Sequence, residues 1–295
     1  SSTIFVGESG LLSRLCIPVL AQYGESVTIS GEGSLLDRHM FGCKEVMEEL
    51  GATCVLTAQE TLPAIVCGPI KGGEITLSGK KGSQFISGLL MALPLCKKNS
   101  TLIVENPTSV PYIQLTIDVI KKFGIEINSR SEENRLIFEI PGKQKYKPAE
   151  FTFEGDWSSA ANFVIIGAIY GDVLLKGLNL TSLQADKKII DVVRKAGAIV
   201  ERKSKGIRVR MGHLSCFDVD VTNCPDLLPG LSIMAALSEG TSHLSGVARL
   251  KNKESDRPLI MTQILNKMGV EAELDGDTLH ITGISIARRI LENNM

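Results

Sequence analysis

The sequence has almost no net charge. Its 32 Lys and Arg residues are balanced by 33 Asp and Glu residues, which leaves a formal net charge of −1. A chain this balanced has no overall field that would attract nucleic acid or an anionic membrane, so we expect neither as a partner. Any site for an anion must therefore be a local cluster of Arg and Lys side chains.

Patterns typical of metal sites, disulfides and membrane spans are also missing. The four histidines show no metal-ligand spacing, and we expect no metal or cofactor. The seven cysteines are odd in number and include no Cys-x-x-Cys pair, which favours reduced thiols in a cytoplasmic protein. No apolar stretch approaches the roughly 20 residues that span a bilayer, and no basic-then-apolar targeting segment opens the chain.

A repeated pattern organises the chain. Glycine ends a helix-like segment with a polar face at Gly51, Gly124, Gly197 and Gly269, which are 73, 73 and 72 residues apart. Before each glycine lie an apolar helix-like run, a short β run and an amphipathic helix-like run, and two short β runs follow it. The regularity predicts one supersecondary unit copied four times. A glycine at each helix end suits a left-handed C-cap, because it has no Cβ.

The first helix of each unit is nearly all apolar, so we expect it to be buried on most sides. These helices are predicted at 11–20, 85–95, 160–169 and 227–237. Strands are predicted at 126–128, 136–140, 272–274 and 278–282, the last two joined by a tight turn at 275–277. A composition break at 142–150 separates two units from two, which predicts domains at 1–150 and 151–295. A cleft between two such domains is a common place for a substrate, and helix N-termini in it would favour an anion.

Several polar segments begin a buried helix, where free backbone N–H groups can bind an anion. Ser83 of Gly82-Ser83-Gln84 could be an ordinary N-cap or bind phosphate. In Asp156-Trp157-Ser158, Asp156 or Ser158 could cap the helix with the tryptophan packed beside it, or the helix start could bind an anion. Asp226 could cap its helix or act as a general base. The charged segment 249–258 could be a solvated loop or a site for an anionic substrate.

Two arginines stand apart from these segments. Arg14 lies inside an apolar run, where a buried guanidinium without a partner would cost several kcal/mol as a rough figure. It must either reach solvent or meet an anion. Arg38 follows the glycine-rich stretch 31–34, in which a ligand could come close to the backbone.

Five motifs carry a resemblance to a known family. They are Gly-Ser-Gln-Phe at 82–85, Ser-Val-Pro-Tyr-Ile at 109–113, Gly-Asp-Trp-Ser-Ser-Ala-Ala at 155–161, Pro-Asp-Leu-Leu-Pro at 225–229 and Lys-Glu-Ser-Asp-Arg at 253–257. In order and spacing they resemble the 5-enolpyruvylshikimate-3-phosphate (EPSP) synthase family, from about residue 4 to residue 283. The resemblance implies a two-domain, inside-out α/β fold of enolpyruvyl transferase type, built from repeated βαβαββ units around buried helices.

The resemblance also implies an activity and its residues. Family members transfer the enolpyruvyl group of phosphoenolpyruvate to the 5-hydroxyl of shikimate-3-phosphate and release phosphate, a step of aromatic amino acid and chorismate biosynthesis. We expect a monomer that needs no cofactor. Shikimate-3-phosphate contacts are implied for Ser83, Gln84, Ser109 and Tyr112, and phosphoenolpyruvate contacts for Arg14, Arg38 and Arg257. Asp226 is implied as the base for the 5-hydroxyl, Glu254 as the acid for the phosphoenolpyruvate methylene, and Lys253 as a contact to the shikimate phosphate or the reacting centre.

The sequence departs from the family pattern at several points. Gly82 replaces a serine, Val110 a lysine and His39 a proline, and the first and last family segments have no counterpart. Four of six family units are therefore present, and we expect this piece alone to be inactive or very weak. The alternative is a non-catalytic relative that keeps the scaffold as a ligand-binding module. The UDP-N-acetylglucosamine enolpyruvyl transferases share the fold, but no cysteine here lies in a motif comparable to their reactive loop.

Overall fold

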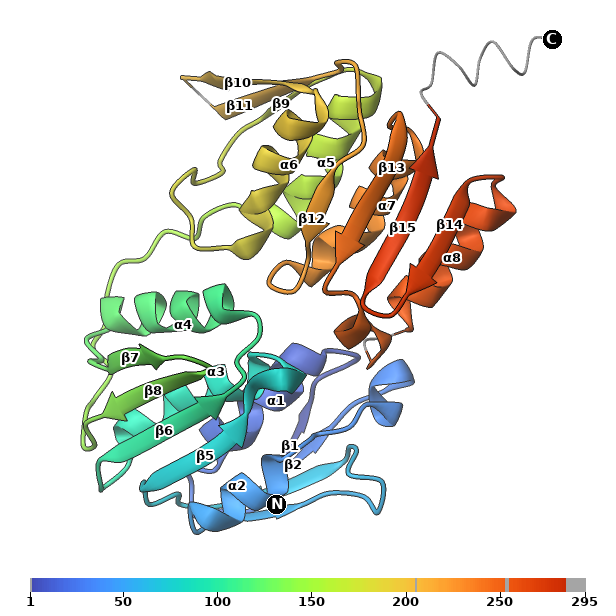
Figure 1. Cartoon of the computed structure of the whole chain (residues 1–295). Coiled ribbons are helices and arrows are strands. Elements are labelled where there is room, and N and C mark those ends of the chain that lie inside the picture. Colours follow the sequence, from blue (N-terminus) through green and yellow to red (C-terminus); the bar gives the residue numbers. More distant parts are fainter. Residues whose placement is uncertain (1, 205, 253–254, 285–295) are drawn as a thin grey trace, which may run out of the picture. The chain divides into compact units, whose positions relative to one another are not determined.

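The computed structural model describes residues 2–204, 206–252 and 255–284. Its contacts divide the chain into two compact units, Ser1–Phe151 and Thr152–Met295 (Figure 1). Each unit has a hydrophobic core of its own, so each is described by itself. Within the described ranges, no helix is both long enough and apolar enough to cross a membrane.

The first unit contains two copies of one β-α-β-α-β-β pattern. The first copy consists of β1 (Ser2–Phe5), α1 (Gly10–Leu20), β2 (Val27–Ser30), α2 (Cys43–Glu49), β3 (Thr53–Val55) and β4 (Ala64–Cys67). The second consists of β5 (Glu74–Ser78), α3 (Gln84–Ala92), β6 (Ser100–Glu105), α4 (Val110–Lys122), β7 (Asn128–Glu132) and β8 (Arg135–Ile140). The strand orders match, β1-β2-β4-β3 and β5-β6-β8-β7. In each sheet the first pair is parallel, which requires a crossover, and α1 or α3 supplies it.

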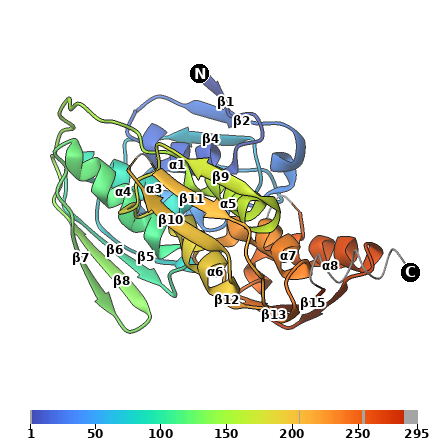
Figure 2. The ribbon, with the colours of Figure 1, turned by 90° about the horizontal axis from the view of Figure 1, so that it is seen from above.

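The second unit contains the third and fourth copies. The third consists of α5 (Trp157–Tyr170), β9 (Asp172–Leu175), α6 (Ile189–Ala196), β10 (Ile199–Lys203) and β11 (Gly206–Arg210). The fourth consists of β12 (Asp218–Asp220), α7 (Leu228–Ala236), β13 (Gly240–Ser245), α8 (Arg257–Lys267), β14 (Glu271–Asp275) and β15 (Thr278–Gly283). The fourth sheet repeats the order of the first two as β12-β13-β15-β14, whereas the third has three strands, β10-β11-β9. Figure 2 shows α7 and α8 on one side of the strands of the fourth sheet.

The predicted repeat is confirmed at its four glycines. Gly51, Gly124, Gly197 and Gly269 each follow the second helix of a copy with a positive φ, of 80°, 82°, 113° and 74° respectively. This left-handed conformation reverses the chain after the helix and costs a glycine least. The predicted turn at the end of the fourth copy is also present, because β14 and β15 pair as antiparallel neighbours on either side of Gly276.

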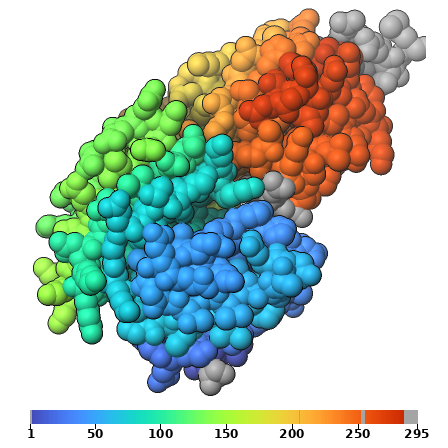
Figure 3. All heavy atoms as spheres, turned by 60° about the horizontal axis from the view of Figure 1, so that its bottom comes forward, coloured from blue at the N-terminus to red at the C-terminus, as the bar shows by residue number. Residues whose placement is uncertain are grey.

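The apolar first helices contribute to each core, but only α3 and α7 are buried on most sides, as was predicted for all four. Helices α1 and α5 each have an exposed apolar face, on which Leu11 is 50% and Phe163 55% exposed. In α3, the residues Phe85, Ile86, Leu89 and Leu90 are all buried. Helix α1 packs so closely against α3 that a Cβ on Gly88 would lie 2.7 Å from Pro18. Figure 3 shows one face of the first unit, coloured blue through green.

Two of the predicted element boundaries are wrong. The helix predicted at 85–95 ends at Ala92 and continues as a 3-10 turn, Leu93–Leu95, because Pro94 has no N–H to donate. The strand predicted at 126–128 lies instead at Asn128–Glu132. Every residue of this edge strand is exposed, so it carries none of the apolar alternation that marks a half-buried strand.

Candidate functional site

In the first unit, Arg14 ties the middle of α1 to the start of α3. Its Nη1 donates to Oε1 of Gln84 at 3.0 Å and to the carbonyl of Gly10 at 3.2 Å. Its Nη2 donates to the carbonyl of His39 at 2.9 Å. The half-buried guanidinium is therefore held in one orientation by groups from three segments. Two of the predicted substrate contacts, Arg14 and Gln84, are in direct contact with each other.

Arg38 lies beside Arg14, and Gly10 makes this possible. A Cβ built on Gly10 would lie 2.5 Å from Nη1 of Arg38 and 2.8 Å from Nη1 of Arg14. The two nitrogens are therefore at most about 5.3 Å apart, the sum of these distances. Two like charges this close repel each other, so the arrangement favours an anion that both can bind. No sequence pattern marked Gly10, because its importance depends on which side chains lie over it.

Two predicted hydroxyl groups lie at helix starts without serving as caps. Ser83 is the N-cap residue of α3 and Ser109 the N-cap residue of α4, but neither side chain makes a capping hydrogen bond. Both are nearly buried, at 8% and 5% exposure. The interpretation of Ser83 as an ordinary capping serine is therefore wrong. Tyr112 lies in the first turn of α4, and its N–H donates to the carbonyl of Ser109 at 3.0 Å.

Side-chain contacts hold the starts of α3 and α4 side by side. The hydroxyls of Ser87 and Thr116 are 2.7 Å apart, and Thr116 also donates to the carbonyl of Tyr112 at 2.9 Å. Just before α4, the hydroxyl of Thr108 donates to the carbonyl of Gly79 at 2.7 Å. The N-terminal ends of both helices, which carry partial positive charge, are thus presented from one region of the first unit.

The glycine-rich stretch 31–34 is filled by a side chain of the same unit. Oε2 of Glu8 accepts hydrogen bonds from the N–H and the hydroxyl of Ser34, both at 3.0 Å. A Cβ on Gly33, where φ is +58°, would lie 2.4 Å from that oxygen. The close approach predicted for a ligand is therefore made by the carboxylate of Glu8. Sequence reasoning also missed a cation, Lys81. Its Nζ lies 4.2 Å from the centre of the ring of Phe41, which follows Arg38 by three residues.

In the second unit, Asp226 lies in a 3-10 turn, Pro225–Leu227, just before α7. The N-cap position of α7 is Leu227, and no side chain caps it, so the interpretation of Asp226 as a helix cap is wrong. Its Oδ1 instead accepts a hydrogen bond from Nη1 of Arg257 at 2.7 Å. This charge-assisted hydrogen bond fixes the orientation of the Asp226 carboxylate.

A second arginine lies within electrostatic range of Asp226. Arg249, in the 3-10 segment Ala248–Asn252, donates from Nη1 to the carbonyl of Thr222. Burial lowers the pKa of the Arg249 guanidinium, and the negative charge of Asp226 opposes part of that shift. At the start of α8, Asp256 caps the helix by accepting from the N–H of Leu259 at 3.1 Å. Lys253 and Glu254, both predicted site residues, lie outside the described residues.

The helix start at Asp156 is a cap with a packed aromatic, one of the two interpretations left open by the sequence. The Asp156 carboxylate accepts from the N–H groups of Ser158 at 2.9 Å and Ser159 at 3.1 Å. Partial burial raises the pKa of this carboxyl, but the hydrogen bonds from Ser159 and Ser158 outweigh it and hold the pKa below its usual range. Trp157 is fully buried, and its indole N–H donates to the carbonyl of Asn179 at 3.0 Å. Because the backbone N–H groups of Ser158 and Ser159 already donate to Asp156, they are not available to a phosphate.

Cys224, two residues before Asp226 in the sequence, has an unreactive thiol. Burial raises the pKa of the Cys224 thiol to about 12, so the thiol stays protonated and unreactive at neutral pH. Burial likewise raises the pKa of Cys54 to about 11. Among the described residues, no group of three or more His, Cys, Asp or Glu side chains is placed to hold a metal ion.

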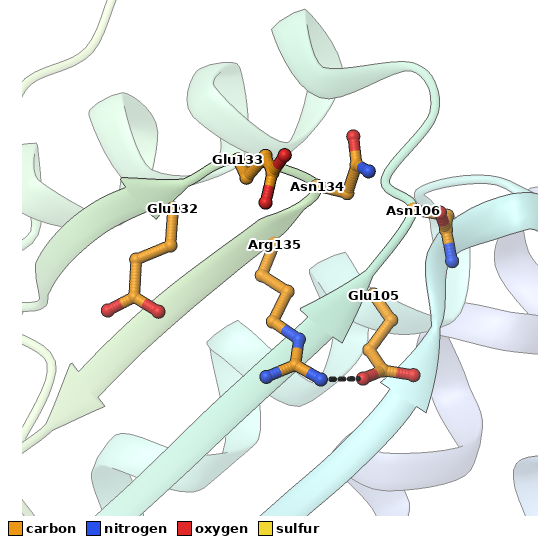
Figure 4. Close-up of a pocket in the computed structure, with 6 residues that line it drawn as sticks. All are labelled: Glu105, Asn106, Glu132, Glu133, Asn134 and Arg135. Carbon is orange, nitrogen blue, oxygen red and sulfur yellow. Dashed lines mark hydrogen bonds and ion pairs between the residues drawn. The ribbon is translucent and has the colours of Figure 1, made fainter.

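A hollow of about 380 Å³ opens elsewhere in the first unit, at the ends of β6, β7 and β8 (Figure 4). It is lined by Glu105, Asn106, Glu132, Glu133, Asn134 and Arg135. The Arg135 guanidinium already pairs with Glu105 at 2.6 Å. The remaining carboxylates would repel a phosphate, so this hollow is not the anion site.

A sequence profile of the family described as EPSP synthase (3-phosphoshikimate 1-carboxyvinyltransferase) matches residues 1–290. The chain belongs to the EPSP synthase family. The resemblance inferred from five motifs is thereby confirmed over nearly the whole chain.

Curated relatives share the same description. The chain is 38% identical over 277 residues to the 3-phosphoshikimate 1-carboxyvinyltransferase of Clostridium acetobutylicum, covering 94% of this chain and 64% of the relative. It is 35% identical over 286 residues to that of Methanococcus maripaludis, covering 95% of this chain and 66% of the relative. The chain thus spans slightly less than two thirds of the length of these relatives.

Solved structures of EPSP synthases have the same fold. The structure is similar to that of EPSP synthase from Acinetobacter baumannii, with a TM-score of 0.75 and 26% identity, covering 97% of this chain and 66% of the other. It also resembles the enolpyruvyl transferase NikO from Streptomyces tendae, with a TM-score of 0.65 and 16% identity over 92% of this chain and 63% of the other. The second likeness supports the fold alone. The predicted α/β fold of enolpyruvyl transferase type is confirmed.

Proposed function

We propose that the protein carrying this chain transfers the enolpyruvyl group of phosphoenolpyruvate to the 5-hydroxyl of shikimate-3-phosphate and releases phosphate. Membership of the EPSP synthase family supports the reaction. The observation that carries the proposal at the level of residues is the pair of guanidinium groups, Arg14 and Arg38, over Gly10. A surface built to hold two cations side by side suits a substrate that carries both a carboxylate and a phosphate.

We assign substrate binding chiefly to the first unit. Arg14 and Arg38 bind phosphoenolpyruvate in this proposal, and Gln84 fixes the orientation of Arg14. The shikimate-3-phosphate contacts are Ser83, Gln84, Ser109 and Tyr112. The start of α3 supports this assignment, because no side chain caps it and backbone N–H groups at a helix start are suited to bind phosphate oxygens.

We assign proton transfer to the second unit. Asp226 takes the proton of the 5-hydroxyl as that oxygen attacks phosphoenolpyruvate, and Glu254 delivers a proton to the methylene carbon. Phosphate then leaves as the enol ether forms. Two carboxylates with opposite tasks can serve an addition followed by an elimination, since one must be ionised and the other protonated at the start. Lys253 and Arg257 add positive charge where anionic oxygens react.

The test is phosphate release from phosphoenolpyruvate and shikimate-3-phosphate by the complete gene product that contains this chain. We expect Asp226→Asn and Glu254→Gln each to slow turnover by roughly 10²–10⁴-fold, the usual loss for a general acid or base. Asp191→Asn is the matched control, because the Asp191 side chain is 70% exposed and, among the described residues, forms an ion pair only with Arg194 in α6. Its turnover should equal that of the wild type.

Two results would count against the proposal. Absence of phosphate release by the wild type would overturn the function and favour a ligand-binding relative. Near-normal turnover in both carboxylate variants would leave the reaction in place but remove the assigned roles.

We propose in addition that the protein works in the cytoplasm as a monomer. The seven free cysteines support a reducing compartment, and light scattering of the purified protein tests the monomer.

A further inference from the structure

Two of the four histidines meet on neighbouring strands of the fourth sheet. His243 on β13 and His280 on β15 are direct partners in the antiparallel register. Their Nδ1 atoms are 2.7 Å apart, and the ring centres are 4.9 Å apart at an interplanar angle of 77°. Because 37 residues separate them in the chain, only the sheet register reveals the pair.

The pair lies in a row with two carboxylates. Asp218 on β12 is the register partner of His243, and Glu273 on β14 is the register partner of His280. Residues at one register level point to the same face of a sheet, so all four side chains lie on one face. This is the face away from the core, since the alternate residues Val219, Leu244 and Leu279 are buried. Helices α7 and α8 cover the other side (Figure 2).

The outer face of the fourth sheet is rich in acidic side chains. The strands β12, β13, β14 and β15 contain no Lys or Arg in their described residues, and five acidic residues share the outer face with the histidines. They are Asp218, Asp220, Glu271, Glu273 and Asp275. Neither Asp218 nor Glu273 forms an ion pair within the described part of the chain. Their charges therefore raise the local concentration of cations around the two imidazoles.

We propose that His243 and His280 form a chelating site for a divalent transition-metal ion such as Cu²⁺, Ni²⁺ or Zn²⁺. The described residues include no set of three or more His, Cys, Asp or Glu ligands, so water fills the remaining coordination positions. Neutral imidazole nitrogen suits these ions, whereas Mg²⁺ and Ca²⁺ prefer oxygen ligands. Asp218 and Glu273 supply negative charge next to the site and do not bind the metal themselves.

The geometry requires only a small adjustment. With metal–nitrogen distances of about 2.0–2.1 Å and a tetrahedral angle, the two nitrogens would be roughly 3.3–3.4 Å apart. The present separation of 2.7 Å must therefore open by about 0.6–0.7 Å. Both rings lie at the surface, so small side-chain rotations provide this movement without a change in the strands. The metal takes the place of the hydrogen bond that now joins the two nitrogens.

The test is a Zn²⁺ titration of the chain, prepared without an affinity tag, followed by calorimetry. We expect one site whose dissociation constant rises at least tenfold in both His243→Ala and His280→Ala. Two controls each remove another potential metal ligand at the surface. His213→Ala removes an imidazole that lies 3.4 Å from the Glu239 carboxylate, and Cys216→Ser removes the exposed thiol. Neither control should change the affinity of the site.

A second measurement identifies the ligands directly. Electron paramagnetic resonance of the Cu²⁺-loaded chain should show coupling to two imidazole nitrogens, and each single histidine variant should lose one of them. Zinc affinity unchanged in the His243→Ala–His280→Ala double variant would overturn the proposal. Loss of the site in His213→Ala or Cys216→Ser would also overturn it, because the metal would then lie elsewhere.

Discussion

Nη1 of Arg257 lies 2.7 Å from Oδ1 of Asp226 and joins the first residue of α8 to the turn that precedes α7. The guanidinium is the more buried partner, with a side-chain exposure of 21% against 45% for the carboxylate. The family resemblance implied different tasks for these residues, a phosphoenolpyruvate contact for Arg257 and the base for the 5-hydroxyl for Asp226. Their contact means that a change in either residue alters the orientation of the other.

The first prediction is that the two residues act as a unit. In the complete gene product, Asp226→Asn and Arg257→Gln should each lower kcat/KM for phosphate release, and the double variant should lose little beyond the worse single variant. Residues in direct contact commonly show coupling of about 0.5–3 kcal/mol, and a shared role makes their effects non-additive. Losses that simply add on the free-energy scale would show that the contact has no bearing on the reaction.

A second prediction concerns Gly10. A Cβ at this position would meet the ends of two flexible side chains, Arg14 and Arg38, so Gly10→Ala should displace them without unfolding the protein. We expect the KM for phosphoenolpyruvate to rise at least tenfold, which corresponds to about 1.4 kcal/mol of lost binding. Gly171→Ala is the control, because a Cβ there would meet no atom within 4 Å. An unchanged KM in Gly10→Ala would separate these arginines from substrate binding.

The repeat allows a third prediction, from two equivalent glycines. At Gly269 a Cβ would meet no atom within 4 Å, so Gly269→Ala should cost only the left-handed backbone conformation, roughly 1–2 kcal/mol. At Gly197 a Cβ would lie 2.1 Å from the carbonyl oxygen of His213, and this backbone atom cannot rotate away. Gly197→Ala should therefore lower the free energy of unfolding more than Gly269→Ala does. Urea denaturation of both variants measures the difference, and equal losses would contradict it.

The fourth prediction separates packing from hydrogen bonding at Trp157. Trp157→Ala should cost about 3–5 kcal/mol, the usual loss when a large buried aromatic is truncated. Trp157→Phe keeps most of the packing but leaves the Asn179 carbonyl without its donor, so it should cost less. Because this is the only tryptophan, circular dichroism rather than fluorescence must follow the unfolding. Equal destabilisation by both variants would mean that packing of the ring contributes little.

The fifth prediction uses the lowered pKa of Asp156. Because the folded-state pKa lies below the unfolded value, the ionised carboxylate stabilises the protein above the unfolded pKa of about 3.9. That stability is lost as the pH falls through the folded pKa. Asp156→Asn still caps the helix but cannot titrate. The stability advantage of the wild type over this variant should therefore be largest near neutral pH and shrink below about pH 4. A constant difference down to pH 3 would contradict the assignment.

Much of the fold followed from local patterns. The glycines at 51, 124, 197 and 269 marked the repeat because a left-handed residue after a helix strongly favours glycine. Apolar first helices and amphipathic second helices could be distinguished by their spacing alone. The exposed strand β7 was misplaced because no apolar residue marks it.

The contacts within the candidate site could not be predicted from the sequence, because they join residues far apart in the chain. The Arg14–Gln84 and Arg257–Asp226 hydrogen bonds join residues 70 and 31 positions apart. The residue types were recognisable from the motifs, but their pairing was not. Gly10, Glu8 and the His243–His280 pair carried no local signal at all, since each depends on a neighbour brought close by tertiary structure or sheet register.

The most direct test of the proposed activity is identification of the product. The complete gene product should convert shikimate-3-phosphate and phosphoenolpyruvate into inorganic phosphate and an enolpyruvyl ether in equal amounts, with the vinyl protons of the ether visible by nuclear magnetic resonance. Asp226→Asn should form both products at the same reduced rate. Phosphate that appears without the ether, or neither product, would contradict the account.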